Sequence, residues 1–72
     1  MKIDIRPIQS ELEELIGEAK VKVKVKLDKH LHVACSVRQT DRAYLVRLNP
    51  TRIRSPQKLD NHLNFCRQAI VS

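Results

Sequence analysis

The most constraining feature of this chain is a run of alternating basic and apolar residues, K-V-K-V-K-V-K-L, at positions 20–27. Successive side chains of a β-strand point to opposite faces of a sheet, so this run would form one apolar face and one basic face. Its valines are β-branched and favour extended backbone. We therefore predict a strand that is buried on one face and exposes its lysines on the other.

Two further stretches, residues 31–37 and 44–48, carry apolar side chains at every second position. The intervening segments 28–29 and 39–42 are polar and short enough to be read as turns. Sequential strands joined by short turns pair in antiparallel fashion. The sequence thus predicts a three-stranded antiparallel meander.

A helix is predicted on the N-terminal side of these strands, because apolar residues recur at helical spacing between Ile8 and Ala19. Pro7 suits a first helical turn, while Ser10 with Glu13 forms a capping box, so the helix could begin at residue 7 or at residue 11. Gly17 could end it in a left-handed conformation. Before this helix, residues 3 and 5 are apolar and alternate with polar residues, so a short extra strand at the N-terminus is an alternative prediction.

A second helix is predicted to begin at Ser55-Pro56, which pairs a capping residue with proline at the first helical position. Its apolar stripe consists of Leu59, Leu63, Cys66 and Ile70. Together these elements predict a single α+β domain over residues 1–72. The three-stranded antiparallel meander would have the N-terminal and C-terminal helices packed on one face.

Composition excludes several classes of function. The chain has 72 residues and a single glycine, so glycine-rich phosphate-binding loops are excluded. It has no apolar run of membrane-spanning length and no secretory signal, so we expect a cytoplasmic protein with no membrane association. In that compartment Cys35 and Cys66 are expected to be reduced. Both fall on apolar faces, so we expect them to be inaccessible, and they could be near neighbours in the core.

Basic residues outnumber acidic ones by 14 to 8, and the whole of this excess lies after residue 19, because the first 19 residues are acidic overall. The alternation places most of these cations on the sheet face opposite the helices, where they could contact nucleic-acid phosphates. Tyr44 is expected on the inner face, so contact with the backbone is favoured over base stacking. Lysines on a short sheet also protect it from aggregation, and this simpler interpretation stays open. The candidate polyanion-binding residues are Lys20, Lys22, Lys24, Lys26, Arg38 and Arg47, with Arg52 and Arg54 in the following connection.

The stretch Y-L-V-R-L-N-P at 44–50, followed by a helix that begins at Ser-Pro, resembles the core of zincin metallopeptidases of the SprT-like and minimal gluzincin types. The resemblance covers roughly residues 8–70. In these families the helix carries H-E-x-x-H, in which two histidines bind zinc and the glutamate activates water. This chain reads H-L-N-F-C at 62–66, so the second histidine is replaced by Cys66 and the glutamate by Leu63. We therefore expect no enzyme activity and no catalytic residues.

Metal binding without catalysis has one candidate pair, because His62 and Cys66 lie one helical turn apart. A structural zinc site needs about four ligands. His30 and His32 are expected on the sheet face away from the helices, too far to complete such a site. The sequence therefore predicts no metal and no other cofactor.

A protein partner is the remaining possibility, since Phe65 lies off the apolar stripe of the second helix and could contact another protein or a second copy of this chain. The sequence thus favours a small non-enzymatic binding module with an unidentified partner. The alternative is sequence-independent binding of a nucleic-acid backbone through the basic sheet face.

Overall fold

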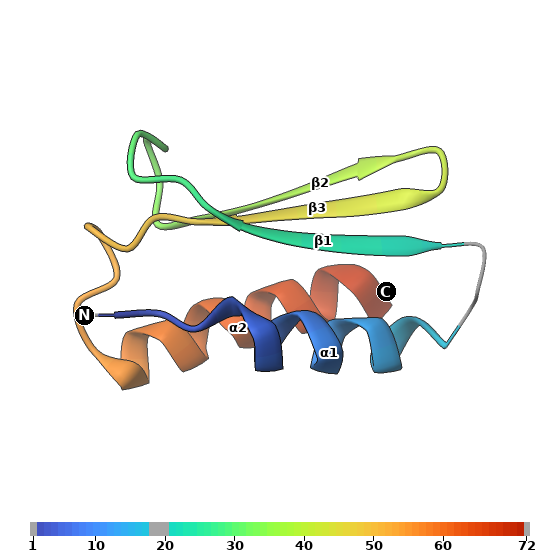
Figure 1. Cartoon of the computed structure of the whole chain (residues 1–72), viewed down its shortest axis with the longest axis horizontal. Helices are drawn as coiled ribbons and strands as arrows, with labels where there is room; N and C mark the ends of the chain where they lie inside the picture. Colours follow the sequence, from blue (N-terminus) through green and yellow to red (C-terminus); the bar gives the residue numbers. More distant parts are fainter. Residues whose placement is uncertain (1, 18–20, 72) are drawn as a thin grey trace.

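The computed structural model describes residues 2–17 and 21–71 and has two layers, a sheet and a pair of helices. Figure 1 shows both helices side by side against the same face of the sheet, which leaves the other face uncovered. The predicted α+β class and the packing of both helices on one face are confirmed. The elements in chain order are α1 (Ile5–Ile16), β1 (Lys22–Leu27), β2 (Cys35–Thr40), β3 (Ala43–Leu48) and α2 (Pro56–Val71).

Helix α1 begins at Ile5, earlier than either predicted start. Asp4 caps it, because its Oδ1 accepts a hydrogen bond from the N–H of Arg6 at 3.1 Å. Pro7 then lies in the first turn, where a backbone N–H has no partner within the helix, so its missing donor costs nothing. Gly17 ends the helix with φ of 63°, as the sequence predicts.

The open possibility of an extra N-terminal strand is wrong. Ile5 belongs to α1, and Ile3 precedes the helix without pairing to the sheet. Ile3 is instead buried in the core, with 7% of its surface exposed. Ile5 is half-buried and packs against the core from the first turn of α1, so the two alternating isoleucines reach the core without pairing to the sheet.

Helix α2 begins where the sequence predicts, since the N–H of Lys58 donates to Ser55 Oγ at 3.2 Å. Along the helix, Leu63, Cys66 and Ile70 are all buried, so this part of the predicted apolar stripe faces the core. The stripe holds the helix under the sheet.

The predicted antiparallel meander is wrong, because the strand order is β1-β3-β2. β3 occupies the centre and pairs in parallel with β1, where Val25 lies opposite Val46. It pairs in antiparallel fashion with β2, where Val37 lies opposite the same Val46. Only the β2–β3 hairpin of the predicted meander is formed.

The connection between β1 and β2 explains the difference. Residues 28–34 do not form a hairpin turn between β1 and β2. They make a turn at Asp28, whose carbonyl accepts a hydrogen bond from the N–H of Leu31 at 3.3 Å, and then cross the end of β3 to reach its far side. Asn49, with 1% of its surface exposed, holds this crossing in place: its Nδ2 donates to the carbonyl of Leu31 at 2.6 Å, and its backbone N–H donates to the carbonyl of Ala34 at 2.9 Å. β2 therefore begins only at Cys35, and Val33, predicted on the apolar face of the strand, is 52% exposed.

One apolar core lies between the two layers. Alternation along β1 and β3 directs Val23, Val25, Val46 and Leu48 toward the helices, as the sequence predicts, whereas Leu27 at the end of β1 is 44% exposed. Ile53, in the connection before α2, closes the end of the core and has no exposed surface. The buried apolar residues are Ile3, Ile8, Leu12, Val23, Val25, Val46, Leu48, Ile53, Leu63, Cys66 and Ile70.

Candidate functional site

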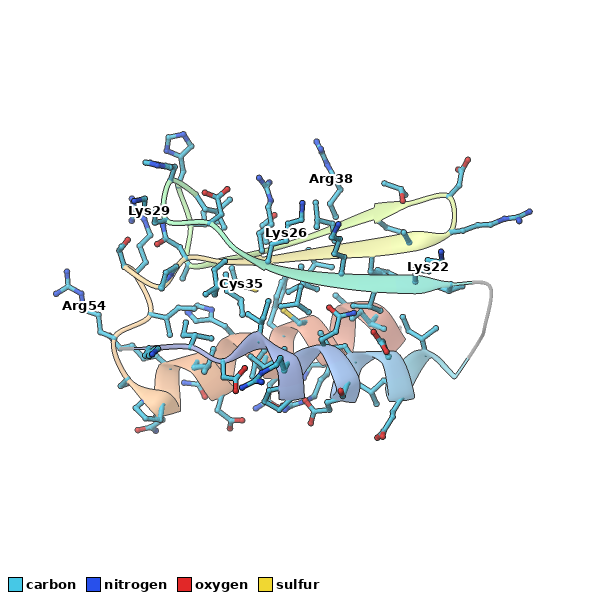
Figure 2. The ribbon with its side chains drawn as sticks, in the orientation of Figure 1. Lys22, Lys26, Lys29, Cys35, Arg38 and Arg54 are labelled. Atoms are coloured by element: carbon cyan, nitrogen blue, oxygen red, sulfur yellow. The ribbon has the colours of Figure 1, made fainter. Side chains whose placement is uncertain are left out.

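The uncovered face of the sheet carries most of the predicted basic residues. The strand register places Lys24, Leu45 and Arg38 in one row across the sheet, and Lys26, Arg47 and Ser36 in the next. These positions alternate with the buried valines, so their side chains point away from the helices. Figure 2 shows Lys26 and Arg38 rising from the sheet on the side opposite α1 and α2. We call Lys22, Lys24, Lys26, Arg38 and Arg47 the outer basic face.

The lysines and Arg38 of this face differ in ion pairing from the two arginines of the helical layer. There Arg6 pairs with Asp4 at 3.2 Å and Arg67 pairs with Glu11 at 2.9 Å, so these cations are already neutralised. On the outer basic face, the three lysines and Arg38 make no ion pair with any carboxylate in residues 2–17 and 21–71. Four cations of this face are therefore exposed and have no acidic partner in the described part of the chain.

Arg47 differs from the other members of the face. Its Nη1 lies 3.6 Å from Asp28 Oδ2, and its side chain is 34% exposed. Its Nε is buried and has no hydrogen-bond partner among the described residues. Arg47 is thus partly committed to Asp28 and contributes less free charge than its neighbours.

Three predicted residues are not placed on the outer basic face. Lys20 lies outside the described residues. Arg52 and Arg54 are exposed in the connection between β3 and α2, and Figure 2 shows Arg54 pointing away from one end of the molecule. Neither extends the row of cations along the sheet.

Two basic residues that were not predicted as binding residues lie at the two ends of the outer basic face. Lys29 lies in the 28–34 connection at one end of the sheet, and Arg42 lies in the β2–β3 turn at the other; both are exposed. The alternation in the sequence could not assign these two residues to a face of the sheet, because side chains alternate between the two faces only within strands. His30 and His32 were predicted on the strand face, which is wrong: both lie exposed in this same connection, where the N–H of His30 donates to Asp28 Oδ1 at 2.9 Å.

The segment H-L-N-F-C at 62–66 lies within α2 and turns partly inward. His62 is half-buried, Leu63 is buried, and Cys66 has no exposed surface. Within the part of the chain that the structure describes, no three or more His, Cys, Asp or Glu side chains gather where they could hold a metal ion. Metal-free folding stays a prediction.

Cys66 instead contacts Cys35, which reaches it from β2. The two Sγ atoms lie 3.1 Å apart and both thiols are free. The predicted burial holds fully for Cys66, whereas Cys35 is only half-buried. Their S–H···S contact lowers the pKa of the Cys35 thiol, and the same contact together with burial raises the pKa of the Cys66 thiol.

Phe65 is the most exposed large apolar side chain of the described residues, at 58%. Its position off the stripe is therefore as predicted. Its role as a contact for a second protein or a second copy stays a prediction.

No protein-family model, curated protein or solved structure matches this chain. The resemblance to zincin peptidases therefore rests on the order of the elements predicted from the sequence and on the residues at 44–50, 55–56 and 62–66, and it stays a prediction. Among the described helices, neither has the length and apolar content needed to cross a lipid bilayer.

Proposed function

We propose that this protein binds the phosphate backbone of nucleic acids, without reading sequence, through the outer basic face. The observation that supports this most strongly is the concentration of four unpaired cations on the one sheet face that no helix covers. Elsewhere in the described chain, the arginines of the helical layer are paired with acids. Unpaired surface cations are the groups that displace counterions from nucleic acid.

The dimensions of the face suit a polyanion strand. Lysines at alternate positions of a strand are spaced by about 6.6 Å, so Lys22, Lys24 and Lys26 span roughly 13 Å. One strand of B-form DNA carries a phosphate for about each 3.4 Å of helix axis, so the row could follow about four nucleotides. Arg38 stands two strands away, at about 10 Å, and would reach a second line of phosphates.

The chemistry of the face favours a duplex over unpaired bases. Proteins that bind single strands usually stack bases on aromatic side chains. The outward positions of the three strands carry lysine, arginine, serine, threonine, alanine and leucine, while Tyr44 lies in register with the inward Val23. Without a stacking platform, the binding energy would come from phosphate contacts, and base sequence should matter little.

We also propose that the domain is not a peptidase. Leu63, where zincins place the catalytic glutamate, is a buried hydrocarbon and cannot accept a proton from water. A general base typically contributes about 10²- to 10⁴-fold to such a reaction. Cys66, at the place of the second histidine, is engaged with Cys35.

The proposal is tested by removing the same number of positive charges from the outer basic face in one variant and from another part of the surface in a control variant. Fluorescence anisotropy with a labelled 20-base-pair duplex would compare Lys24→Gln/Lys26→Gln with the control Lys2→Gln/Lys58→Gln, whose exposed lysines lie outside the sheet. Each pair removes two positive charges. We expect the outer-face variant to bind at least about 10-fold more weakly, because it loses two phosphate contacts, and the control to change affinity about 2-fold or less.

Circular dichroism would verify that both variants fold, since all four substituted side chains are exposed. A duplex of scrambled sequence should bind with the same affinity as the first. Equal weakening by the two variants would show that net charge alone attracts nucleic acid, and the outer basic face would then not be the site.

A further inference from the structure

We propose that Cys35 and Cys66 are a reversible disulfide pair that can lock β2 to α2. This site is independent of the proposed nucleic-acid binding, because both thiols lie on the inner side of the sheet. The sequence suggested two inert core thiols, whereas the structure brings their sulfur atoms into direct contact. The inference rests on that contact and on the unequal burial of the two residues.

The contact joins two elements that are distant in the chain. Cys35 begins β2 and Cys66 lies in the middle of α2, 31 residues later. Figure 2 places Cys35 where the sheet faces the helices. The two Sγ atoms are 3.1 Å apart, and a disulfide bond is about 2.05 Å long, so closure needs only about 1 Å of approach.

Unequal burial sets the order of the reaction. Cys66 has no exposed surface, so an oxidant in solution cannot reach it in the folded protein, whereas Cys35 is only half-buried. The S–H···S contact with Cys66 also lowers the pKa of the Cys35 thiol. The more exposed and more acidic thiol therefore reacts first, and the buried one resolves it.

The exchange can be written with glutathione disulfide as the oxidant. The Cys35 thiolate attacks one sulfur of glutathione disulfide, forming a mixed disulfide and releasing one glutathione thiolate. Cys66 then attacks Cys35 Sγ, which forms the internal disulfide and expels the second glutathione, and that leaving thiolate takes the proton from Cys66. Overall the two cysteines lose two electrons and two protons, and glutathione disulfide is reduced to two glutathione molecules.

The test is to treat the folded, full-length protein with glutathione disulfide and to measure its intact mass. We expect a product lighter by two hydrogen atoms and monomeric on a non-reducing gel. Tryptic digestion without reduction should join the peptide 30–38 to the peptide 59–67, which contain the two cysteines. Added dithiothreitol should restore the original mass.

Single variants test the order of attack. Cys66→Ser should accumulate a glutathione adduct on Cys35, because the resolving thiol is gone. Cys35→Ser should leave Cys66 unmodified while folded and modified in urea. If either serine variant does not fold, Cys66→Ala and Cys35→Ala serve the same purpose.

Two results would overturn the inference. One is a wild-type protein that stops at the glutathione adduct or remains unmodified. The other is a disulfide that forms only between two molecules.

Discussion

Asn49 shows how one side chain determines the path of the chain. It is 1% exposed, and its amide and carbonyl groups join two separate segments. Nδ2 donates to the carbonyl of Leu31, while Oδ1 accepts from both the N–H and the hydroxyl of Thr51, at 2.9 Å and 2.6 Å. The amide thereby fastens the crossing connection to the turn that leads into α2.

Replacing Asn49 with alanine should destabilise the protein by about 2–4 kcal/mol, because buried backbone groups near Leu31 and Thr51 would lose their partners. This is a large share of the roughly 4–11 kcal/mol expected for a domain of this length. Urea denaturation followed by circular dichroism would measure the loss. Asn61→Ala, at an exposed position of α2, is the matched control and should change the free energy of unfolding by less than about 0.5 kcal/mol. Similar values for both variants would contradict the role assigned to Asn49.

At the residue scale, the sequence predicted which face of the sheet a side chain lies on better than it predicted which distant residues that side chain contacts. Lys22, Lys24, Lys26 and Arg38 lie on the predicted face, because period-two alternation depends only on local backbone geometry. The Asn49 amide contacts and the 3.1 Å approach of the two cysteine sulfurs depend on segments far apart in the chain. No local pattern encodes such contacts, although the shared burial of the cysteines indicated that they could be neighbours.

Among the elements, β1 is an edge strand whose outer side is covered by a side chain of α1. Gln9 Oε1 accepts the N–H of Val25 at 2.7 Å, and Gln9 Nε2 donates to the carbonyl of Val23. The amide thus satisfies two backbone groups that would otherwise be open to pairing with another chain. It also fixes the helix against the edge of the sheet.

Gln9→Ala should expose this edge and weaken the packing of α1 on β1. We expect a loss of about 1 kcal/mol in the free energy of unfolding, because water can replace only part of the two bonds. Amide hydrogen exchange by NMR should show faster exchange at Val25. Ser10→Ala, at an exposed neighbouring position, is the control, and protection at Val25 that is the same in both variants would contradict the assignment.

The sequence predicted the existence of the strands but not their order. Alternation identified β1 and β3 and the later part of β2, yet it says nothing about which strands are neighbours. The error arose from taking Asp28-Lys29 as a hairpin turn that joins β1 directly to β2. The longer connection 28–34 instead carries the chain across the end of β3 to its far side, so β3 lies between the other two strands and pairs in parallel with β1.

The molecule as a whole separates its charges between its two layers. Acidic side chains of α1, including Glu11, Glu13 and Glu14, belong to the helical layer, whereas four cations with no acidic partner among the described residues lie on the outer basic face. A positive field on one side would orient the protein toward a polyanion before contact. The field would also explain why the cations are left unpaired, since neutralising acids nearby would abolish it.

The salt dependence of duplex binding by the wild-type protein tests the central claim most directly. Four unpaired cations should release about four counterions, so the logarithm of the association constant should fall with the logarithm of salt concentration with a slope of about −3 to −4. Anisotropy titrations between about 50 and 200 mM salt would give this slope. Absence of saturable binding at the lowest salt, or a slope near zero, would contradict the account and leave the lysine row as protection of the sheet against aggregation.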